Sequence, residues 1–145
     1  MTHSPKNTTI KQDLPPHIKV GQIGEDVAAK YLKNKGFKIL DRNYRRKWAE
    51  IDIVARGTDD KVHFVEVKTV SYETRDILER MVTRETWRPE EMVHARKLRQ
   101  IHKGVESWLA DHNYQGGFQI DVLAIRLAMQ ERIASINHIE NVILA

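Results

Sequence analysis

The sequence predicts an α/β fold, a three-layer sandwich around a central mixed five-stranded sheet in the order α-β-β-β-α-β-β. Two long segments carry apolar residues at helical spacing, and five shorter segments are rich in β-branched and aromatic residues. The first three of those strands are joined by short connections, which favours an antiparallel meander. This order is typical of helices packed on both faces of one sheet.

The first half of the chain predicts one helix and the meander. The helix covers Gly21–Lys35, where Ile23 and Val27 belong to an apolar stripe, and Gly36 ends it as a C-cap. Residues 57–60 form a tight turn between the second and third strands. The three strands are predicted at Phe37–Asn43, Glu50–Arg56 and Lys61–Val70.

The second half predicts a second helix and the last two strands. Residues 71–88 are polar, charged and aperiodic, and they predict a long loop or a helical insertion. Pro89 suits the start of a helix that runs to about Ala110, with Trp108 in its core-facing stripe. The last strands are predicted at Phe118–Leu127 and Arg132–Val142.

Length and composition limit the classes of protein to consider. The 145 residues predict a flexible polar leader at 1–18 and one domain at 19–145. The net charge of +4 is a mild basic bias, compatible with a polyanionic partner. The absence of cysteine excludes disulfides, cysteine-bound zinc, iron–sulfur clusters and thiol nucleophiles. No apolar run predicts a membrane helix or a signal-peptide core, so we expect a cytoplasmic protein without a membrane partner.

Two charged residues interrupt the most apolar strand. Glu66 and Lys68 lie in VHFVEVKTV (62–70), and alternation along a strand places both on one face. Burying unpaired charges is costly, which indicates a site rather than packing. Asp52 lies between two isoleucines of AEIDIVA (49–55), on the strand expected beside them. The structural alternative is a salt bridge on an edge strand.

Asp52 and Glu66 together predict a metal site. Two carboxylates about 4 Å apart repel by roughly 4 kcal/mol at an effective dielectric constant near 20, and a divalent cation removes that repulsion. Oxygen-only ligands suit Mg²⁺ or Mn²⁺. Such a cation acidifies water and polarises phosphoryl oxygens, while a nearby lysine stabilises developing charge. These groups suffice for phosphodiester hydrolysis.

The Asp…Glu-x-Lys pattern resembles the PD-(D/E)xK nuclease signature. More specifically, the chain resembles the YraN family of endonuclease-like proteins, which is similar in core fold to Holliday junction resolvases. The matching segments are GQIGEDVAAKYLKNKGFKILDRNYR (21–45), AEIDIVA (49–55), VHFVEVKTV (62–70), FQIDVLAI (118–125) and, less specifically, INHIENVI (136–143). The resemblance implies a restriction-endonuclease-like core, a DNA substrate, structure-specific cleavage of branched or junction DNA, and Mg²⁺ or Mn²⁺ as cofactor.

The resemblance also implies roles for individual residues. Asp52 and Glu66 would bind the metal with the backbone carbonyl of Val67, Lys68 would be the catalytic lysine, and Glu25 would assist. The residues of secondary rank are Glu50, Gln119 and Asp121. The chain departs from the family pattern at Ala49, where glycine is usual, and at Thr69, where a basic residue is common.

Several of these residues have plainer interpretations. Glu25 fits a solvated first helical turn, Glu50 either supports the metal or meets Arg46, and Asp121 is equally consistent with pairing to a core arginine or to backbone. A basic cluster near the predicted site has two interpretations, phosphate binding or a solvated charged surface. It comprises Arg42, Arg45, Arg46 and Lys47. The same two interpretations apply to charges of the second helix: His94, Arg96, Lys97, Arg99 and Lys103.

Aromatic and imidazole side chains are weaker signals. Trp48 and Trp87 fall in loops, where they are weak candidates for stacking on bases. Three histidines lack ligand spacing, and a solvated or structural role is expected for His63, His94 and His102.

The leading hypothesis is therefore a metal-dependent endonuclease acting on DNA. The alternative is a nucleic-acid-binding module that keeps the nuclease fold with little or no catalytic activity. A third is an interaction protein whose charges form a structural network. A homodimer is expected if the substrate is a four-way junction, because such a substrate is symmetric.

Overall fold

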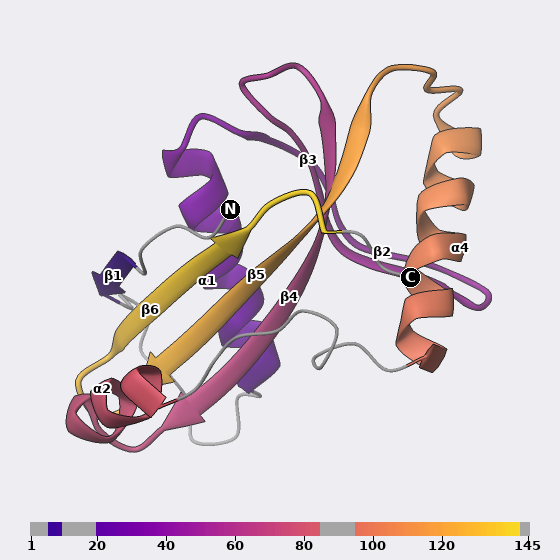
Figure 1. Cartoon of the computed structure of the whole chain (residues 1–145). Coiled ribbons are helices and arrows are strands. Elements are labelled where there is room, and N and C mark those ends of the chain that lie inside the picture. The colour runs from indigo at the N-terminus through magenta and orange to yellow at the C-terminus, as the bar shows by residue number, and fades with distance from the viewer. Residues whose placement is uncertain (1–5, 10–19, 85–94, 143–145) are drawn as a thin grey trace.

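The computed structural model of the chain describes residues 6–9, 20–84 and 95–142, which form one mixed sheet flanked by helices (Figure 1). Among these residues the helices are α1 (Val20–Asn34), α2 (Arg75–Arg84) and α4 (Ala95–Asp111). The strands are β1 (Lys6–Thr9), β2 (Lys38–Arg46), β3 (Ala49–Arg56), β4 (Val62–Tyr72), β5 (Phe118–Ala128) and β6 (Ile133–Ile139). No helix in the described parts of the chain is long and apolar enough to cross a membrane.

The predicted α/β sandwich with a mixed sheet is confirmed. The spatial order of the strands is β1-β6-β5-β4-β3-β2. Strands β2, β3 and β4 form the predicted antiparallel meander, and β4 pairs in parallel with β5 across the α4 connection. The five predicted strands are all present, and β1 adds a short sixth strand to the edge.

Strand β1 differs from the flexible leader expected at 1–18. Residues 6–9 pair antiparallel with β6, with Lys6 opposite Ile136 and Thr9 opposite Ile133. A short polar strand gains its hydrogen bonds from a distant partner, so local composition does not reveal it. The other leader residues lie outside the described ranges, and the predicted domain limits stay a prediction.

Within the charged segment predicted as a loop or helical insertion, the structure has a helix. Strand β4 continues to Tyr72, and α2 follows at Arg75–Arg84. The backbone N–H of Ile77 donates to Thr74 Oγ1 (3.3 Å), which caps the start of α2. Residues 85–94, with Trp87, His94 and the predicted helix start at Pro89, lie outside the described ranges.

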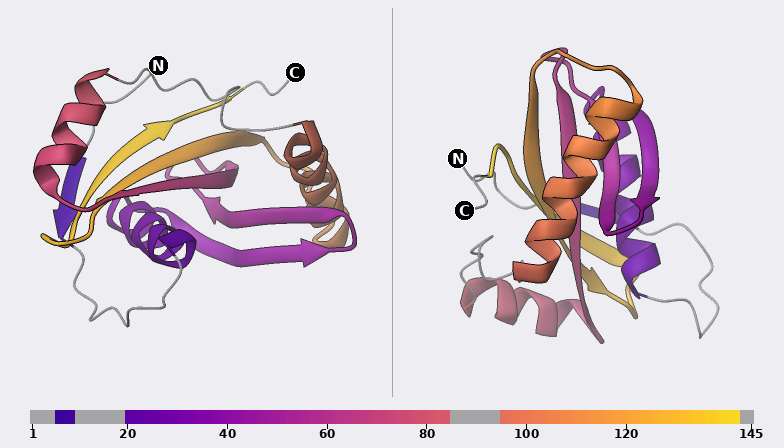
Figure 2. Two further views of the ribbon diagram at one scale, coloured as in Figure 1. Left: turned by 90° about the horizontal axis from the view of Figure 1, so that it is seen from below. Right: turned by 90° about the vertical axis from the view of Figure 1, so that its right-hand side faces the viewer.

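Helix α1 covers one face of the sheet (Figure 2). Its buried residues Ala28 and Leu32 pack in a cluster with Ile53, Val65 and Ile125 from three strands. The stripe predicted for 21–35 is therefore a true core face. Helix α1 is consequently held against the strands that carry the candidate site.

Helix α4 covers the opposite face, over β2 and β3. Its residues Ile101, Val105 and Trp108 form a second cluster with Val54 and Phe64. Alternate strand residues thus face the two helices, as expected for a sheet covered on both sides. Trp108 is 3% exposed, which confirms its predicted core position.

Two glycines allow both helices to approach the sheet closely. A Cβ atom at Gly24 of α1 would collide with the side chain of Thr69 on β4. A Cβ atom at Gly104 of α4 would lie 2.6 Å from Ile51 Cγ1 and 3.1 Å from the carbonyl oxygen of Glu50. Each glycine therefore sets how near its helix, with the polar residues that helix carries, comes to β3 and β4.

Replacing Gly24 by alanine should destabilise the fold, because the added methyl group overpacks the α1–β4 contact. We expect Gly24→Ala to lower the free energy of unfolding by about 1–3 kcal/mol, measured by urea denaturation. Gly21→Ala is the matched control in the same helix, because a Cβ at Gly21 meets nothing within 4 Å. An equal effect of both variants would contradict this account.

Candidate functional site

The site is built at a fork between β3 and β4. Their backbone pairing runs from Arg56–Val62 to Ile53–Val65 and goes no further. Beyond it, the N–H of Val67 donates to Asp52 Oδ2 (2.8 Å). The side chain of Asp52, which is 6% exposed, thus takes the place of a backbone acceptor. The β2–β3 hairpin then diverges from β4 toward α4 (Figure 1).

Glu66 lies beside Asp52 in a largely dry environment. Its side chain is 11% exposed, and its Oε2 atom is buried without a hydrogen-bond partner among the described residues. Burial, and after it the neighbouring carboxyl of Asp52, raise the pKa of Glu66 to about 9. Asp52 and Glu66 therefore lie close together, as predicted. The positive charge around them is too small to keep both carboxyl groups ionised at neutral pH.

Helix α4 supplies a lysine to this pair. Lys97 Nζ lies 3.2 Å from Glu50 Oε2 and 3.7 Å from Glu66 Oε1. Burial lowers the pKa of Lys97, but the carboxylates of Glu66 and Asp52 outweigh burial and raise it. The sequence placed Lys97 only in a helical basic cluster. One feature of the sequence could have indicated that Lys97 faces the sheet: it lies seven residues, or about two helical turns, before Gly104, and therefore on the same face of the helix.

Glu25 of α1 is close enough to Asp52 to feel its charge. Burial raises the pKa of Glu25, and the negative charge of Asp52 raises it further, while Arg42 and Arg45 act in the opposite direction. A polar cleft of about 660 Å³ adjoins Glu25, and Arg42, Asn43 and Arg45 are among its lining residues. Glu25 therefore faces a cleft beside Asp52 instead of open solvent.

Glu50 is held by two cations. Its Oε1 atom accepts a hydrogen bond from Arg45 (3.1 Å), and its Oε2 atom pairs with Lys97. Burial raises the pKa of Glu50, but these two cations outweigh burial and lower it. The partner expected for a structural Glu50 was Arg46, which instead pairs with Asp111 of α4 (3.3 Å).

Lys68 differs from its expected environment. It is exposed on β4, and it forms no hydrogen bond or ion pair within the described ranges. The expectation of two buried charges on this strand is therefore wrong for Lys68 and applies to Glu66 alone. The reason is the fork, because departure of the β2–β3 hairpin opens the end of β4 to solvent. Lys68 therefore presents an exposed side chain near the open end of the fork.

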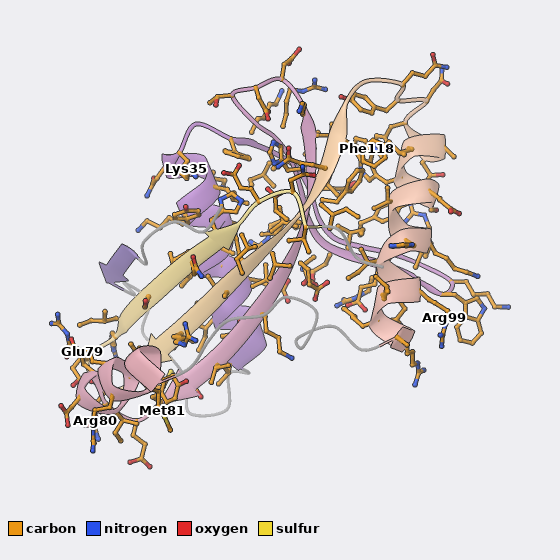
Figure 3. All side chains as sticks on the ribbon, in the orientation of Figure 1. Lys35, Glu79, Arg80, Met81, Arg99 and Phe118 are labelled. Carbon is orange, nitrogen blue, oxygen red and sulfur yellow. The ribbon has the colours of Figure 1, made fainter. Side chains whose placement is uncertain are left out.

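The predicted basic cluster is partly paired. Arg42 donates to Asp26 Oδ1 (2.8 Å), Arg45 and Arg46 have the acidic partners given above, and Lys47 is exposed at the hairpin turn. On α4, Arg99 points into solvent (Figure 3), as do Arg96 and Lys103. Among the described members of that helix cluster, Lys97 is the one that pairs with the carboxylates.

Asp121 belongs to a second, separate cluster, in which Asp121, His63 and His138 are buried. Its Oδ2 atom accepts hydrogen bonds from His63 Nδ1 (2.7 Å) and His138 Nε2 (2.9 Å). Its Oδ1 atom accepts from the Gln119 amide (2.8 Å) and the Asn141 backbone (2.9 Å). Of the two pairings expected for Asp121, the backbone partner is present, and histidines take the place of arginine.

These four donors explain the ionisation of the cluster. Burial raises the pKa of Asp121, but hydrogen bonds from His138 and His63 outweigh it and hold the pKa well below its usual range. His63 also contacts Asp59 through Nε2 (3.1 Å). Burial lowers the pKa of His63, whereas its bonds to Asp121 and Asp59 raise it on balance. His63 on β4, Asp121 on β5 and His138 on β6 thus form a hydrogen-bonded clasp across three strands. The structural role expected for His63 fits this clasp.

One group with metal-ligand spacing includes part of this cluster. His63, Asp121 and Glu140 each offer an atom within 4.8 Å of the others, so they could hold a metal ion. However, both oxygens of Asp121 already accept two hydrogen bonds each. The hydrogen-bonded clasp accounts for Asp121 without a cation, unlike Glu66, whose Oε2 atom is unpartnered.

Comparison with known proteins identifies the family. The model of "Uncharacterised protein family UPF0102" matches residues 24–125. The chain belongs to this family. A UPF0102 protein of Campylobacter jejuni is 36% identical over 73% of this chain and 82% of its own length. Another, from Alkaliphilus oremlandii, is 36% identical over 85% of this chain and 96% of its own length. The matched UPF0102 region contains α1 from Gly24 onward and all of β3, β4 and α4, and hence the whole fork.

The clasp around His63 should make stability depend on pH. Because folding raises the pKa of His63 above 6.5, its contribution is fully present below that pH and is lost as pH rises through the folded-state pKa. We therefore expect the free energy of unfolding, measured by urea denaturation, to fall as pH rises above 6.5.

Comparison with His63→Gln isolates this contribution, because the raised pKa of Glu66 also makes stability fall with pH. The stability difference between wild type and His63→Gln should shrink as pH rises. His102→Gln, at an exposed position of α4, is the matched control and should keep the wild-type pH profile. A pH-independent difference for His63→Gln would refute the charged clasp.

Proposed function

We propose that this protein is a metal-dependent endonuclease that hydrolyses phosphodiester bonds in DNA. The observation that carries the proposal is the Asp52–Glu66 pair at the fork. One oxygen of Glu66 is buried without a partner, and the pKa of this carboxyl is raised to about 9. Such a pair suits a bound cation, because the cation can take the place of the proton on Glu66 and offset the repulsion between the two ionised carboxylates.

The donor set fits Mg²⁺ or Mn²⁺. Asp52 and Glu66 would hold the ion, with the carbonyl of Val67 as the predicted third ligand and Glu25 as an assisting carboxylate. All these donors are oxygens, which hard divalent cations prefer. A divalent cation at this position supplies Lewis acidity toward water and phosphate.

The chain's own residues would position and neutralise the reacting groups. The Val67 N–H fixes the orientation of Asp52. Lys97 offsets part of the negative charge of Glu50 and Glu66, so that an anionic phosphate can approach. Lys68, which is exposed beyond Glu66 on β4, is suited to stabilise charge that develops on the phosphate. Arg42 and Arg45 line the adjoining cleft and would contact neighbouring phosphates.

The metal affinity should increase with pH. Binding must displace the proton that Glu66 holds up to about pH 9, so the association constant for Mn²⁺ should rise about tenfold per pH unit between 7 and 9. Isothermal titration calorimetry in buffers of different ionisation enthalpy measures both the affinity and the released proton.

Two variants test where the metal binds. Glu66→Gln should bind Mn²⁺ weakly and without this pH dependence, whereas Glu79→Gln, an exposed glutamate on α2, should behave as wild type. Wild-type affinity in Glu66→Gln would exclude the fork as the metal site.

DNA cleavage is the direct test of function. Purified protein is incubated with single-stranded, duplex, flapped and four-way-junction DNA, in Mg²⁺, Mn²⁺ or EDTA. We expect cleavage only with metal, and a loss of about 10²–10³-fold in rate for Asp52→Asn and for Lys68→Ala, with DNA binding retained in Lys68→Ala. Lys103→Ala, at an exposed lysine of α4, is the matched control.

Each other outcome has a defined meaning. Binding without cleavage under every metal supports the nucleic-acid-binding module. Neither binding nor cleavage at low salt excludes both functions. Cleavage that survives in Asp52→Asn would place the activity outside this fork.

A further inference from the structure

We infer that the tip of the β2–β3 hairpin recognises unpaired DNA bases near the cleavage site, with Trp48 as the stacking surface. This inference rests on the proposed nuclease function and specifies its substrate: DNA in which a single strand is splayed from a duplex. Three observations carry it, namely the exposure and backbone of Trp48, the bracing of the hairpin, and the surrounding charge.

Trp48 is held in solvent at an unfavourable backbone position. Its side chain is 63% exposed, more than that of the other exposed large hydrophobic residues described, Phe118 (46%) and Met81 (37%). Its φ angle is 65°, in the left-handed region that glycine and asparagine favour at hairpin turns. Among the described residues, neither packing nor turn geometry calls for tryptophan here, and its large exposed aromatic surface is suited to contact with a bound partner.

The hairpin holds this tip in place by contacts with α4. The hydroxyl of Tyr44 donates to Asp111 Oδ2 (2.6 Å) and lies 2.9 Å from the hydroxyl of Ser107. The guanidinium of Arg46 stacks over the Tyr44 ring at 4.4 Å and pairs with Asp111. Because the base of the tip is braced, an aromatic platform at Trp48 loses little conformational freedom on binding.

The charges around Trp48 favour a polyanionic strand. Lys47 precedes Trp48 and is exposed, and the side chains of Arg45 and Arg46 remain 61% and 55% exposed despite their acidic partners. Aromatic side chains interleaved with cations are typical of surfaces that bind single-stranded nucleic acid, where bases stack and phosphates pair. A purely apolar protein partner would not require these cations.

The tip is within reach of the candidate metal site along one DNA strand. Trp48 precedes Asp52 by four residues, which spans about 13 Å in an extended strand. That length corresponds to on the order of four nucleotides of a B-form strand. A base in an intact duplex is stacked between its neighbours and cannot lie on Trp48. Stacking therefore favours DNA with unpaired nucleotides next to the phosphate that is cut.

The experiment compares two DNAs that differ only in pairing. The full chain is titrated, in EDTA to prevent cleavage, into a fully paired duplex and into the same duplex with a single-stranded flap. Fluorescence anisotropy gives the affinities, and 2-aminopurine in the flap reports stacking. We expect tighter binding of the flapped DNA and a 2-aminopurine signal that changes on binding.

Substitutions at the tip test the role of Trp48. Trp48→Ala should lower the ratio of flapped to duplex affinity by at least about fivefold and remove the 2-aminopurine change, while Trp48→Phe retains most of both. Phe118→Ala is the matched control, because Phe118 is exposed at the start of β5, outside the hairpin (Figure 3), and it should leave the ratio unchanged.

The possible failures are distinguishable. If wild type cleaves duplex DNA with metal but Trp48→Ala leaves the affinity ratio unchanged, the inference is wrong and the proposed function stands. If wild type neither binds nor cleaves any of these DNAs, both are wrong. If sedimentation shows self-association that Trp48→Ala abolishes, the tip is a contact between copies of this chain, which also overturns the inference.

Discussion

The hydrogen bond from the N–H of Val67 to the carboxylate of Asp52 determines the shape of the candidate site. In an uninterrupted antiparallel pair, that N–H would bond to a carbonyl of β3. A side-chain acceptor satisfies it instead, so the part of β3 that precedes Ile53 can separate from β4 without leaving this N–H unsatisfied. The hairpin then crosses to α4, and β4 continues beside β5. The carboxyl pair, the access of Lys68 to solvent and the position of Trp48 all follow from this divergence.

The buried acidic centres at Asp121 and at Glu66, both in the described part of the chain, differ in how completely their oxygens are hydrogen-bonded. Asp121 accepts four hydrogen bonds, and its pKa lies well below the usual range because those donors stabilise the anion. Glu66 has one oxygen without a hydrogen-bond partner among the described residues, and its pKa is far above the usual range because burial and Asp52 disfavour the anion. A satisfied centre stabilises the fold, whereas an unsatisfied one marks a place for a ligand. This contrast, rather than acidity alone, directs attention to the fork.

Helix packing completes the fork from both sides. Gly24 lets α1 approach Thr69, which brings Glu25 toward Asp52. Gly104 lets α4 approach the backbone at Glu50, which brings Lys97 over the carboxylates. Thr69, which stands where the family pattern often has a basic residue, is therefore the residue on which Gly24 packs. The site depends on two close helix–sheet contacts as much as on the acidic residues themselves.

Local pattern was enough to predict α1, α4, the five long strands in their order, both core faces and the nearness of Asp52 to Glu66. Each of these follows from periodicity or from a short turn between neighbouring strands. Strand β1 was not predictable, because its hydrogen bonds come from β6. The partners of Asp121 were also left open, since His63 and His138 belong to different strands.

Which charges meet at the site depends on how the helices and strands pack, and the sequence pattern did not reveal it. The tertiary structure placed Lys97 against Glu50 and Glu66, and it left Lys68 exposed at the rim. It also gave Trp48 its exposed position at a braced hairpin tip. The physical reason is that local pattern reports which face of a segment is buried. The distance between side chains on separate segments depends on how helices and strands pack, and a fork in the sheet has no local signature.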